Sequence, residues 1–202
     1  MTTRNLLAGA AAIGGAASIL LLVGHVWAHD DALPKSAGTQ MKPTLVQSRP
    51  GTNAWNAGRA PADWWADIQR QHGHVGPWNV LGWRIAQAAL RELKSEWGRH
   101  ELEVVCYVPL LTPFTCLVDG LAVGTGNSLG RLDLRLAEVL DYRQCFVGVR
   151  RKDQAGEVLE FRPPAAYLKS IVNQPVEKLA TLSRECSQMP EENLFSIRRL
   201  AR

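Results

Sequence analysis

The chain has 202 residues, of which 46% are hydrophobic and 21% charged, and its formal net charge is +4. This size and composition suit one globular domain with attached segments, and they exclude wholesale disorder and a multi-span membrane protein. Lysine and arginine are scattered among acidic residues rather than gathered into a stripe, so we expect no nucleic-acid partner.

The N-terminus has the features of an export signal. Arg4 precedes a run, residues 6–27, that contains no charged side chain, and the small residue Ala28 follows. This order predicts a secretory signal peptide over residues 1–28. About 20 apolar residues can also span a bilayer, so an uncleaved membrane anchor is the alternative. Either way we expect a periplasmic or other extracytoplasmic protein that touches a membrane only through this segment.

An extracytoplasmic location would allow the cysteines to form disulfides. The chain has four of them: Cys106, Cys116, Cys145 and Cys186. Four cysteines allow three full pairings, and the sequence does not choose among them.

After residue 28 a polar segment is followed by segments whose apolar residues recur at helical spacing. Residues 29–61 have few large apolar side chains, which predicts a flexible linker. A short helix is expected over 64–71. It is followed by a His-Gly-His loop and by a helix that begins at Pro77, where proline suits the first turn, and continues to Trp97.

The rest of the chain predicts an α+β fold. Strands are expected at 101–110, 132–139, 144–151 and 157–162, with a short helix at 113–120 and a glycine-rich turn at 124–130. We therefore expect a single domain over residues 62–163, with an antiparallel or mixed sheet flanked by helices. Residues 164–202 are amphipathic and predict a C-terminal helical extension that packs on the domain or on a second copy.

Two short motifs carry residues that could bind a metal. In extended backbone His72 and His74 would point the same way and could reach one ion. Cys116 and Asp119 have the i, i+3 spacing that shares a helix face. Each motif alone also has a plainer interpretation, namely solvated histidines, a buried cysteine and a capping aspartate.

Three other features could carry chemistry but have simpler explanations. The glycine-rich segment 124–130 could hold an anion with its N–H groups, although a tight turn between helix and strand explains its glycines better. Several tryptophans, Trp65 among them, could form an aromatic ligand cage, but most are explained by the need for core mass. His100 precedes a strand and is expected at the surface.

Taken together, the motifs resemble the FmdE family, which takes its name from formylmethanofuran dehydrogenase. The matching segments are His72-Gly-His-Val-Gly-Pro-Trp78, Leu81-Gly-Trp-Arg84, Cys116-Leu-Val-Asp-Gly-Leu-Ala122 and Thr125-Gly-Asn-Ser-Leu-Gly-Arg131. The resemblance extends from about residue 65 to residue 163. Gly76 and Asn127 stand where the family has cysteines, and the zinc ribbon often found after the domain is missing.

The resemblance implies an α+β domain, usually a homodimer, with a metal-binding cleft. It makes His72, His74 and Cys116 the expected ligands, with Asp119 as a fourth ligand or as a partner that orients one of them. Two nitrogens and one sulfur suit zinc, and would also accept nickel, copper or iron.

Two functional hypotheses follow, and a third depends on the cysteines. The first is an exported metal-binding FmdE-like domain linked to one-carbon or redox metabolism, outside the family's cytoplasmic formylmethanofuran reaction. The second is a degenerate, non-catalytic binding or scaffold module that has lost its metal centre. The third, a disulfide-bonded structural protein, requires Cys116 to be bonded.

Overall fold

The computed structural model describes residues 60–154 and 156–201. The predicted signal peptide or anchor, residues 1–28, and all but the end of the predicted linker lie outside the described residues. None of the helices in the described part of the chain is long and apolar enough to cross a membrane.

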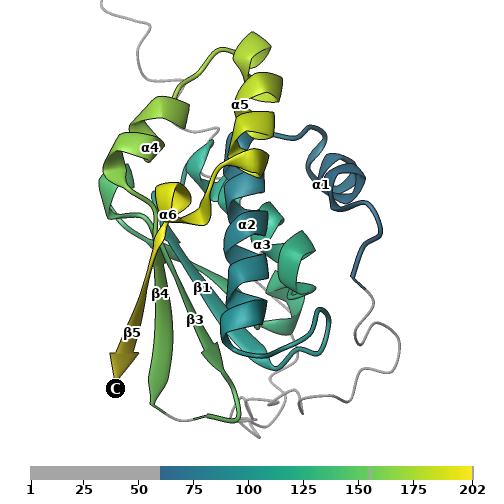
Figure 1. Ribbon diagram of the computed structural model, residues 1–202, viewed down its shortest axis with the longest axis vertical. Coiled ribbons are helices and arrows are strands. Elements are labelled where there is room, and N and C mark those ends of the chain that lie inside the picture. Colours follow the sequence, from purple (N-terminus) through teal and green to yellow (C-terminus); the bar gives the residue numbers. More distant parts are fainter. Residues whose placement is uncertain (1–59, 155, 202) are drawn as a thin grey trace, which may run out of the picture. The chain divides into compact units, whose positions relative to one another are not determined.

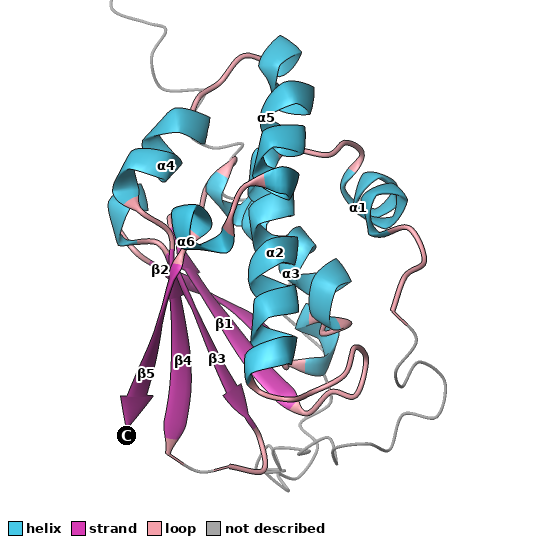
Figure 2. Ribbon diagram, viewed as in Figure 1, coloured by secondary structure: helices cyan, strands magenta, loops and turns pink. Residues whose placement is uncertain are grey.

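Six α-helices and five strands make up the described part of the chain (Figures 1 and 2). The helices are α1 (Trp64–His72), α2 (Pro77–Glu92), α3 (Leu117–Thr125), α4 (Ala165–Ile171), α5 (Val176–Gln188) and α6 (Glu191–Leu194). The strands are β1 (Leu102–Val108), β2 (Leu134–Glu138), β3 (Phe146–Arg151), β4 (Glu157–Arg162) and β5 (Ser196–Ala201).

The strands form one mixed sheet in the order β2-β1-β3-β4-β5. β1 and β2 are parallel and are joined by the crossover that contains α3, whereas the other neighbours are antiparallel. Parallel neighbours need such a crossover because a tight turn can join only antiparallel strands. The predicted α+β class with a mixed sheet and flanking helices is confirmed.

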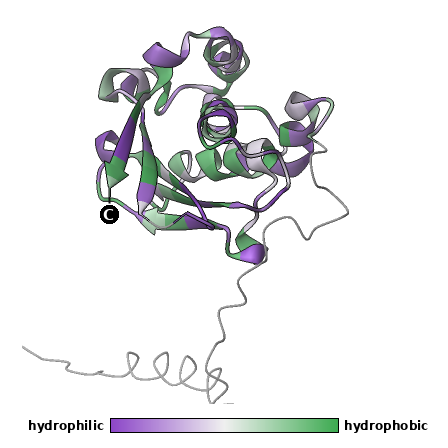
Figure 3. Cartoon of the chain, turned by 60° about the horizontal axis from the view of Figure 1, so that its bottom comes forward, coloured by the Kyte–Doolittle hydropathy of each residue, from purple (hydrophilic) through white to green (hydrophobic). Residues whose placement is uncertain are grey.

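One hydrophobic core joins the helices to the sheet. Alternate residues of β1, namely Leu102, Val104, Cys106 and Val108, are buried, as period-two geometry requires for one covered face. They belong to the same cluster as buried side chains of α2, α3 and α4. In Figure 3 the apolar segments, drawn green, concentrate where the helices meet the sheet.

Glycines allow α2 and α3 to cross in close contact. A Cβ atom added to Gly120 would lie 1.8 Å from the Asn79 carbonyl oxygen, and one added to Gly82 would lie 2.1 Å from the Leu117 carbonyl oxygen. Any side chain at these positions would force the backbones apart. This crossing fixes the start of α2 beside the start of α3, and the candidate site lies at that end.

Several elements are shorter than the sequence predicts, and backbone geometry explains two of them. The helix expected to reach Trp97 ends at Glu92, because Lys94 adopts a left-handed φ of 49° that no helix can continue. The strand expected from residue 132 begins at Leu134, since Leu132 also has a left-handed φ, 59°.

The prediction that helices fill the C-terminal region is wrong at its end. After α6 the backbone extends at Phe195, and Ser196–Ala201 pairs antiparallel with β4. The pairing satisfies backbone groups along the edge of β4, a long-range contact that local periodicity does not reveal. The C-terminus is therefore part of the sheet.

All four cysteines are buried and none forms a disulfide. Because Cys116 is a free thiol, the requirement for a disulfide-bonded structural protein is not met.

Candidate metal centre

His72 and Asp119 come together from two helices. His72 is the last residue of α1 and Asp119 lies in the first turn of α3. The His72 Nδ1 atom is 2.6 Å from the Asp119 Oδ2 atom. This hydrogen bond occupies Nδ1 and leaves Nε2 as the ring nitrogen for a ligand. A carboxylate in this position fixes the orientation and tautomer of a metal-binding histidine.

His74 lies beside His72, but the backbone between them is not the extended segment that we expected. Gly73 adopts a left-handed φ of 92°, and its N–H donates to the Gln69 carbonyl oxygen to close α1. Glycine suits this position because it carries no Cβ. The resulting turn still brings the two imidazole rings to 4.8 Å between centroids.

Cys116 lies at the start of α3 and is nearly buried, with 9% of its surface exposed. Burial, and after it the charge of Asp119, raises the pKa of the Cys116 thiol. The thiol is therefore protonated at neutral pH and would have to lose a proton before it could bind a metal.

Asn79 holds this region together, although it belongs to none of the motifs that were singled out in the sequence. Its side chain is fully buried, and its Oδ1 atom accepts from the Gly76 N–H at 2.8 Å. Its Nδ2 atom donates to the Cys116 carbonyl oxygen at 2.9 Å. The amide thus joins the histidine loop to the start of α3. Asn79 lies three residues after the N-cap Gly76, a position from which side chains often bond back to the cap. This spacing was the one sequence signal for its role.

Gly76 also borders the histidines. A Cβ atom built on it would lie 3.5 Å from His74 Nε2 and 3.3 Å from Asn79 Oδ1. The Gly76 backbone is extended, with φ −114° and ψ 162°, a conformation open to any residue. A longer side chain at this position would therefore lie against the His74 ring.

The glycine-rich segment lies at the opposite end of α3 and serves as a turn. The Asn127 N–H donates to Thr125 Oγ1 and the Ser128 N–H donates to Asp133 Oδ1. The Asn127 side chain donates to the carbonyl oxygens of Leu102 and Asp133. These two N–H groups have partners inside the protein and are not available to an anion. The segment connects α3 to β2, as the interpretation as a turn expects.

His100 is buried, with 6% of its surface exposed, so its predicted surface position is wrong. Its Nδ1 atom lies 3.4 Å from the Asp133 carboxylate, which is itself 1% exposed. Arg131 and Lys152 also lie within 4 Å of that carboxylate. The histidine therefore belongs to a buried ionic cluster that the local sequence does not indicate.

The four predicted ligands do not form a ready-made metal site. His72 contacts both His74 and Asp119, and the charge of Asp119 acts on Cys116. Within the described residues, however, no three His, Cys, Asp or Glu side chains are arranged to hold one ion. The two imidazoles suit a divalent transition metal, and their geometry supplies two protein ligands rather than four.

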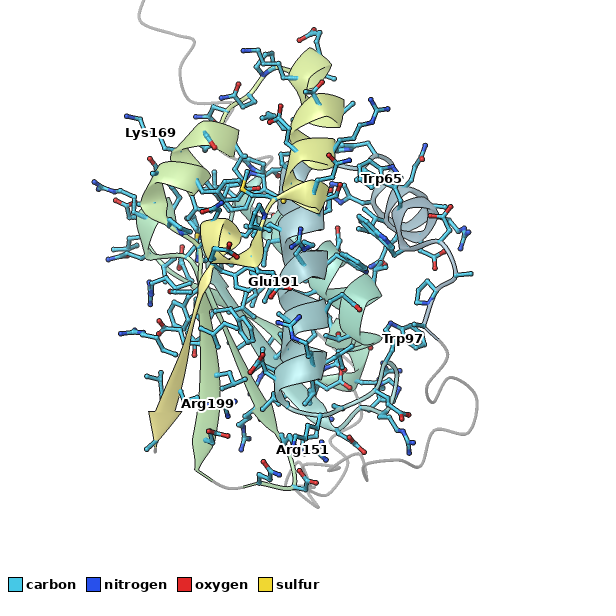
Figure 4. The ribbon with its side chains drawn as sticks, viewed as in Figure 1. Trp65, Trp97, Arg151, Lys169, Glu191 and Arg199 are labelled. Atoms are coloured by element: carbon cyan, nitrogen blue, oxygen red, sulfur yellow. The ribbon has the colours of Figure 1, made fainter. Side chains whose placement is uncertain are left out.

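His74 also faces a cleft of about 550 Å³ between α1 and α5. The cleft is lined by Trp65, Gln69, His74, Val75, Val176, Leu179, Ala180 and Arg184. Figure 4 shows Trp65 on the side of α1 that faces α5. No sequence pattern predicted a ligand cleft against the C-terminal helices.

Comparison with known families identifies the domain. The model of the family described as FmdE, molybdenum formylmethanofuran dehydrogenase operon, matches residues 71–196. The chain belongs to the FmdE family. The match contains both histidines, Cys116 and Asp119, and it continues beyond residue 163, where we expected it to end, to include α4, α5 and α6. The family's description links the domain to metal-associated one-carbon metabolism. No curated protein matches the chain.

Proposed function

We propose that this FmdE-family domain binds one divalent transition metal ion, preferentially zinc, through His72 and His74. The observation that carries the proposal is the 2.6 Å hydrogen bond between Asp119 and His72 Nδ1, with the second imidazole alongside. A carboxylate bound to one nitrogen of a histidine is the usual arrangement behind a metal-binding imidazole. The imidazole nitrogens of both side chains suit zinc, copper, nickel or iron.

The roles of the residues follow from their contacts. Asp119 holds the His72 ring with its proton on Nδ1, and Asn79 fixes the histidine loop against α3. The Cys116 thiol is not arranged with the two imidazoles to hold one ion, so it would have to lose its proton and move toward them to become a third donor. A zinc ion with open positions would act as a Lewis acid and would lower the pKa of bound water.

We also propose a location, a metabolic role and an oligomeric state for the protein. The charge-free run of residues 6–27 supports export to the periplasm or another extracytoplasmic compartment. Family membership supports a role in one-carbon or redox metabolism, and the resemblance supports a homodimer.

A second candidate is a non-catalytic binding or scaffold module. Its support is the lack of three converging ligand side chains among the described residues, together with glycine at position 76 beside His74. In this case the domain would keep the fold and bind a partner without any metal.

Metal content separates the two candidates. The purified full chain would be analysed by elemental mass spectrometry beside the double variant His72→Ala/His74→Ala and the control Gln71→Ala, an exposed neighbour on α1. We expect about one ion per chain in the wild type and the control, and none in the double variant. A wild-type chain without stoichiometric metal, even after incubation with zinc, would leave the scaffold as the function.

A further inference from the structure

Among the residues that the structure describes, the cleft beside His74 combines a mostly apolar lining with one cation, Arg184. Its walls are formed by Trp65 from α1 and by Leu179 and Ala180 from α5, and Val75 of the histidine loop also lines it. Its volume of about 550 Å³ lies within the range of small-molecule sites. A ligand here would need an apolar body that fits against the indole ring.

Arg184 gives the cleft its charge. No aspartate or glutamate is among the described residues that line it, and Arg184 forms no ion pair with any of the described carboxylates. Most exposed arginines of this domain do pair with a carboxylate, for example Arg91 with Glu191 at 2.7 Å. A guanidinium left without a carboxylate beside an apolar wall suits the carboxylate group of a ligand, which it can bind through two parallel hydrogen bonds.

The α5 wall is fixed to the rest of the domain. The Ser183 hydroxyl contacts the Val75 carbonyl oxygen at 3.1 Å. Arg84 donates to the carbonyl oxygens of Cys186 and Ser187 at the end of the helix. These contacts hold Arg184 and the histidine loop on the same cleft, so a bound carboxylate compound would lie next to His74.

We infer that the cleft between α1 and α5 binds a small monocarboxylate with an apolar body, whose carboxylate pairs with Arg184 and whose apolar part packs on Trp65. This inference deepens the proposed function and rests on it for the link to metal, because His74 borders both the cleft and the His72 ring. The ligand class itself follows from the lining of the cleft.

The test uses phenylacetate as the probe and phenylacetamide as its neutral counterpart. Each is titrated into the full chain after removal of metal with a chelator, and the tryptophan indole N–H signals are followed by NMR. A Trp65→Phe variant assigns the Trp65 signal. We expect the Trp65 signal to shift and saturate with phenylacetate, with phenylacetamide binding about tenfold more weakly.

Two charge variants make the test specific. Arg184→Gln removes the cation from the cleft and should raise the Kd for phenylacetate about tenfold. Lys169→Gln removes an equal charge from α4, on the side of the molecule away from Trp65, and should leave the Kd unchanged (Figure 4). Both side chains are exposed, so unchanged signals from the other tryptophans would show that the fold is kept.

Any of three results would overturn the inference: no saturable shift, equal binding of the amide, or an unchanged Kd in Arg184→Gln. Because this experiment contains no metal, it is separate from the metal measurement. Carboxylate binding without zinc binding would refute the proposed function alone, and zinc binding without carboxylate binding would refute this inference alone.

Discussion

The two ends of α3 carry two of the four segments that resemble the FmdE family. The near end, at Cys116 and the histidine loop, and the far end, at residues 125–133, differ in how fully their polar groups are satisfied. At the far end, Asn127 and Asp133 are buried and bonded to backbone and to cations on several sides. At the near end, His72 is held on one nitrogen by Asp119, while the neighbouring His74 is exposed. The far end is built for stability, and the near end keeps donor atoms available for a ligand.

The two positions where the resemblance implies cysteines in the family, 76 and 127, lie at these different ends. Gly76 borders His74, whereas Asn127 joins β1 to the residue before β2 at the other end of the helix. Of the two positions, only position 76 is therefore placed to put a donor beside the histidines. Asn127 is a structural amide in the turn.

The largest effect is expected at the far end. Asp133→Ala would leave the Ser128 N–H and the charges of Arg131 and Lys152 without the buried carboxylate that they contact. We expect the free energy of unfolding to fall by about 3–5 kcal/mol, measured by urea denaturation. The control Asp153→Ala removes an exposed carboxylate that pairs with Arg151, and it should cost much less. Equal losses in the two variants would mean that the buried cluster does not stabilise the turn.

Gly76→Cys adds a sulfur donor at the near end of α3, next to the histidines. The new thiol would lie beside His74 Nε2, so we expect zinc to bind about a hundredfold more tightly in competition with a chromophoric chelator. Gly130→Cys adds an exposed thiol beyond the other end of α3, where nothing lies within 4 Å, and should change zinc affinity little. A similar gain in zinc affinity in both variants would show that the gain does not depend on where the thiol lies.

Asp119→Asn tests the orienting role of the carboxylate. The amide keeps the size of the side chain but loses the charge that holds the proton on His72 Nδ1. We expect zinc affinity to fall about tenfold, with little change in the urea midpoint, because the pair is partly exposed. A large loss of stability with unchanged zinc affinity would assign Asp119 to the fold instead.

The smallest effect concerns pH. Burial and the charge of Arg131 lower the pKa of His100, against the opposing pull of Asp133. The unfolded chain therefore takes up a proton at His100 first, so stability falls as pH drops below about 6.5 and levels off below the folded pKa.

His100→Asn should remove this part of the pH dependence, with an effect of about 1 kcal/mol or less between about pH 7.5 and about pH 5.5. Asparagine is chosen because the position has a left-handed φ of 57°. Identical pH profiles for the wild type and the variant in urea denaturation would contradict the assignment.

Local patterns predicted the elements well where short-range rules decide them. The predicted strand at 157–162 coincides with β4, and the predicted helix at 64–71 differs from α1 by one residue. These elements depend on periodicity, capping and turn chemistry, which a single segment contains. The grouping of His72, His74, Cys116 and Asp119 was instead implied by the family resemblance, because it depends on contact between segments more than forty residues apart.

Features that depend on distant contacts could not be read from the sequence. β5 forms because β4 offers an edge, and His100 is buried because Asp133, more than thirty residues later, lies beside it. The sequence shows Asn79 only as a residue of a helix, and its hydrogen bond to Cys116 appears once α3 is packed against α2. The different roles of positions 76 and 127 likewise appear only once the two ends of α3 are separated in space.

The most direct test of the account is the zinc stoichiometry of the full chain beside His72→Ala/His74→Ala, measured by elemental mass spectrometry after zinc loading and desalting. The account predicts about one ion per wild-type chain and none in the double variant. Equal zinc in both proteins, or none in either, would contradict a metal site at this end of α3.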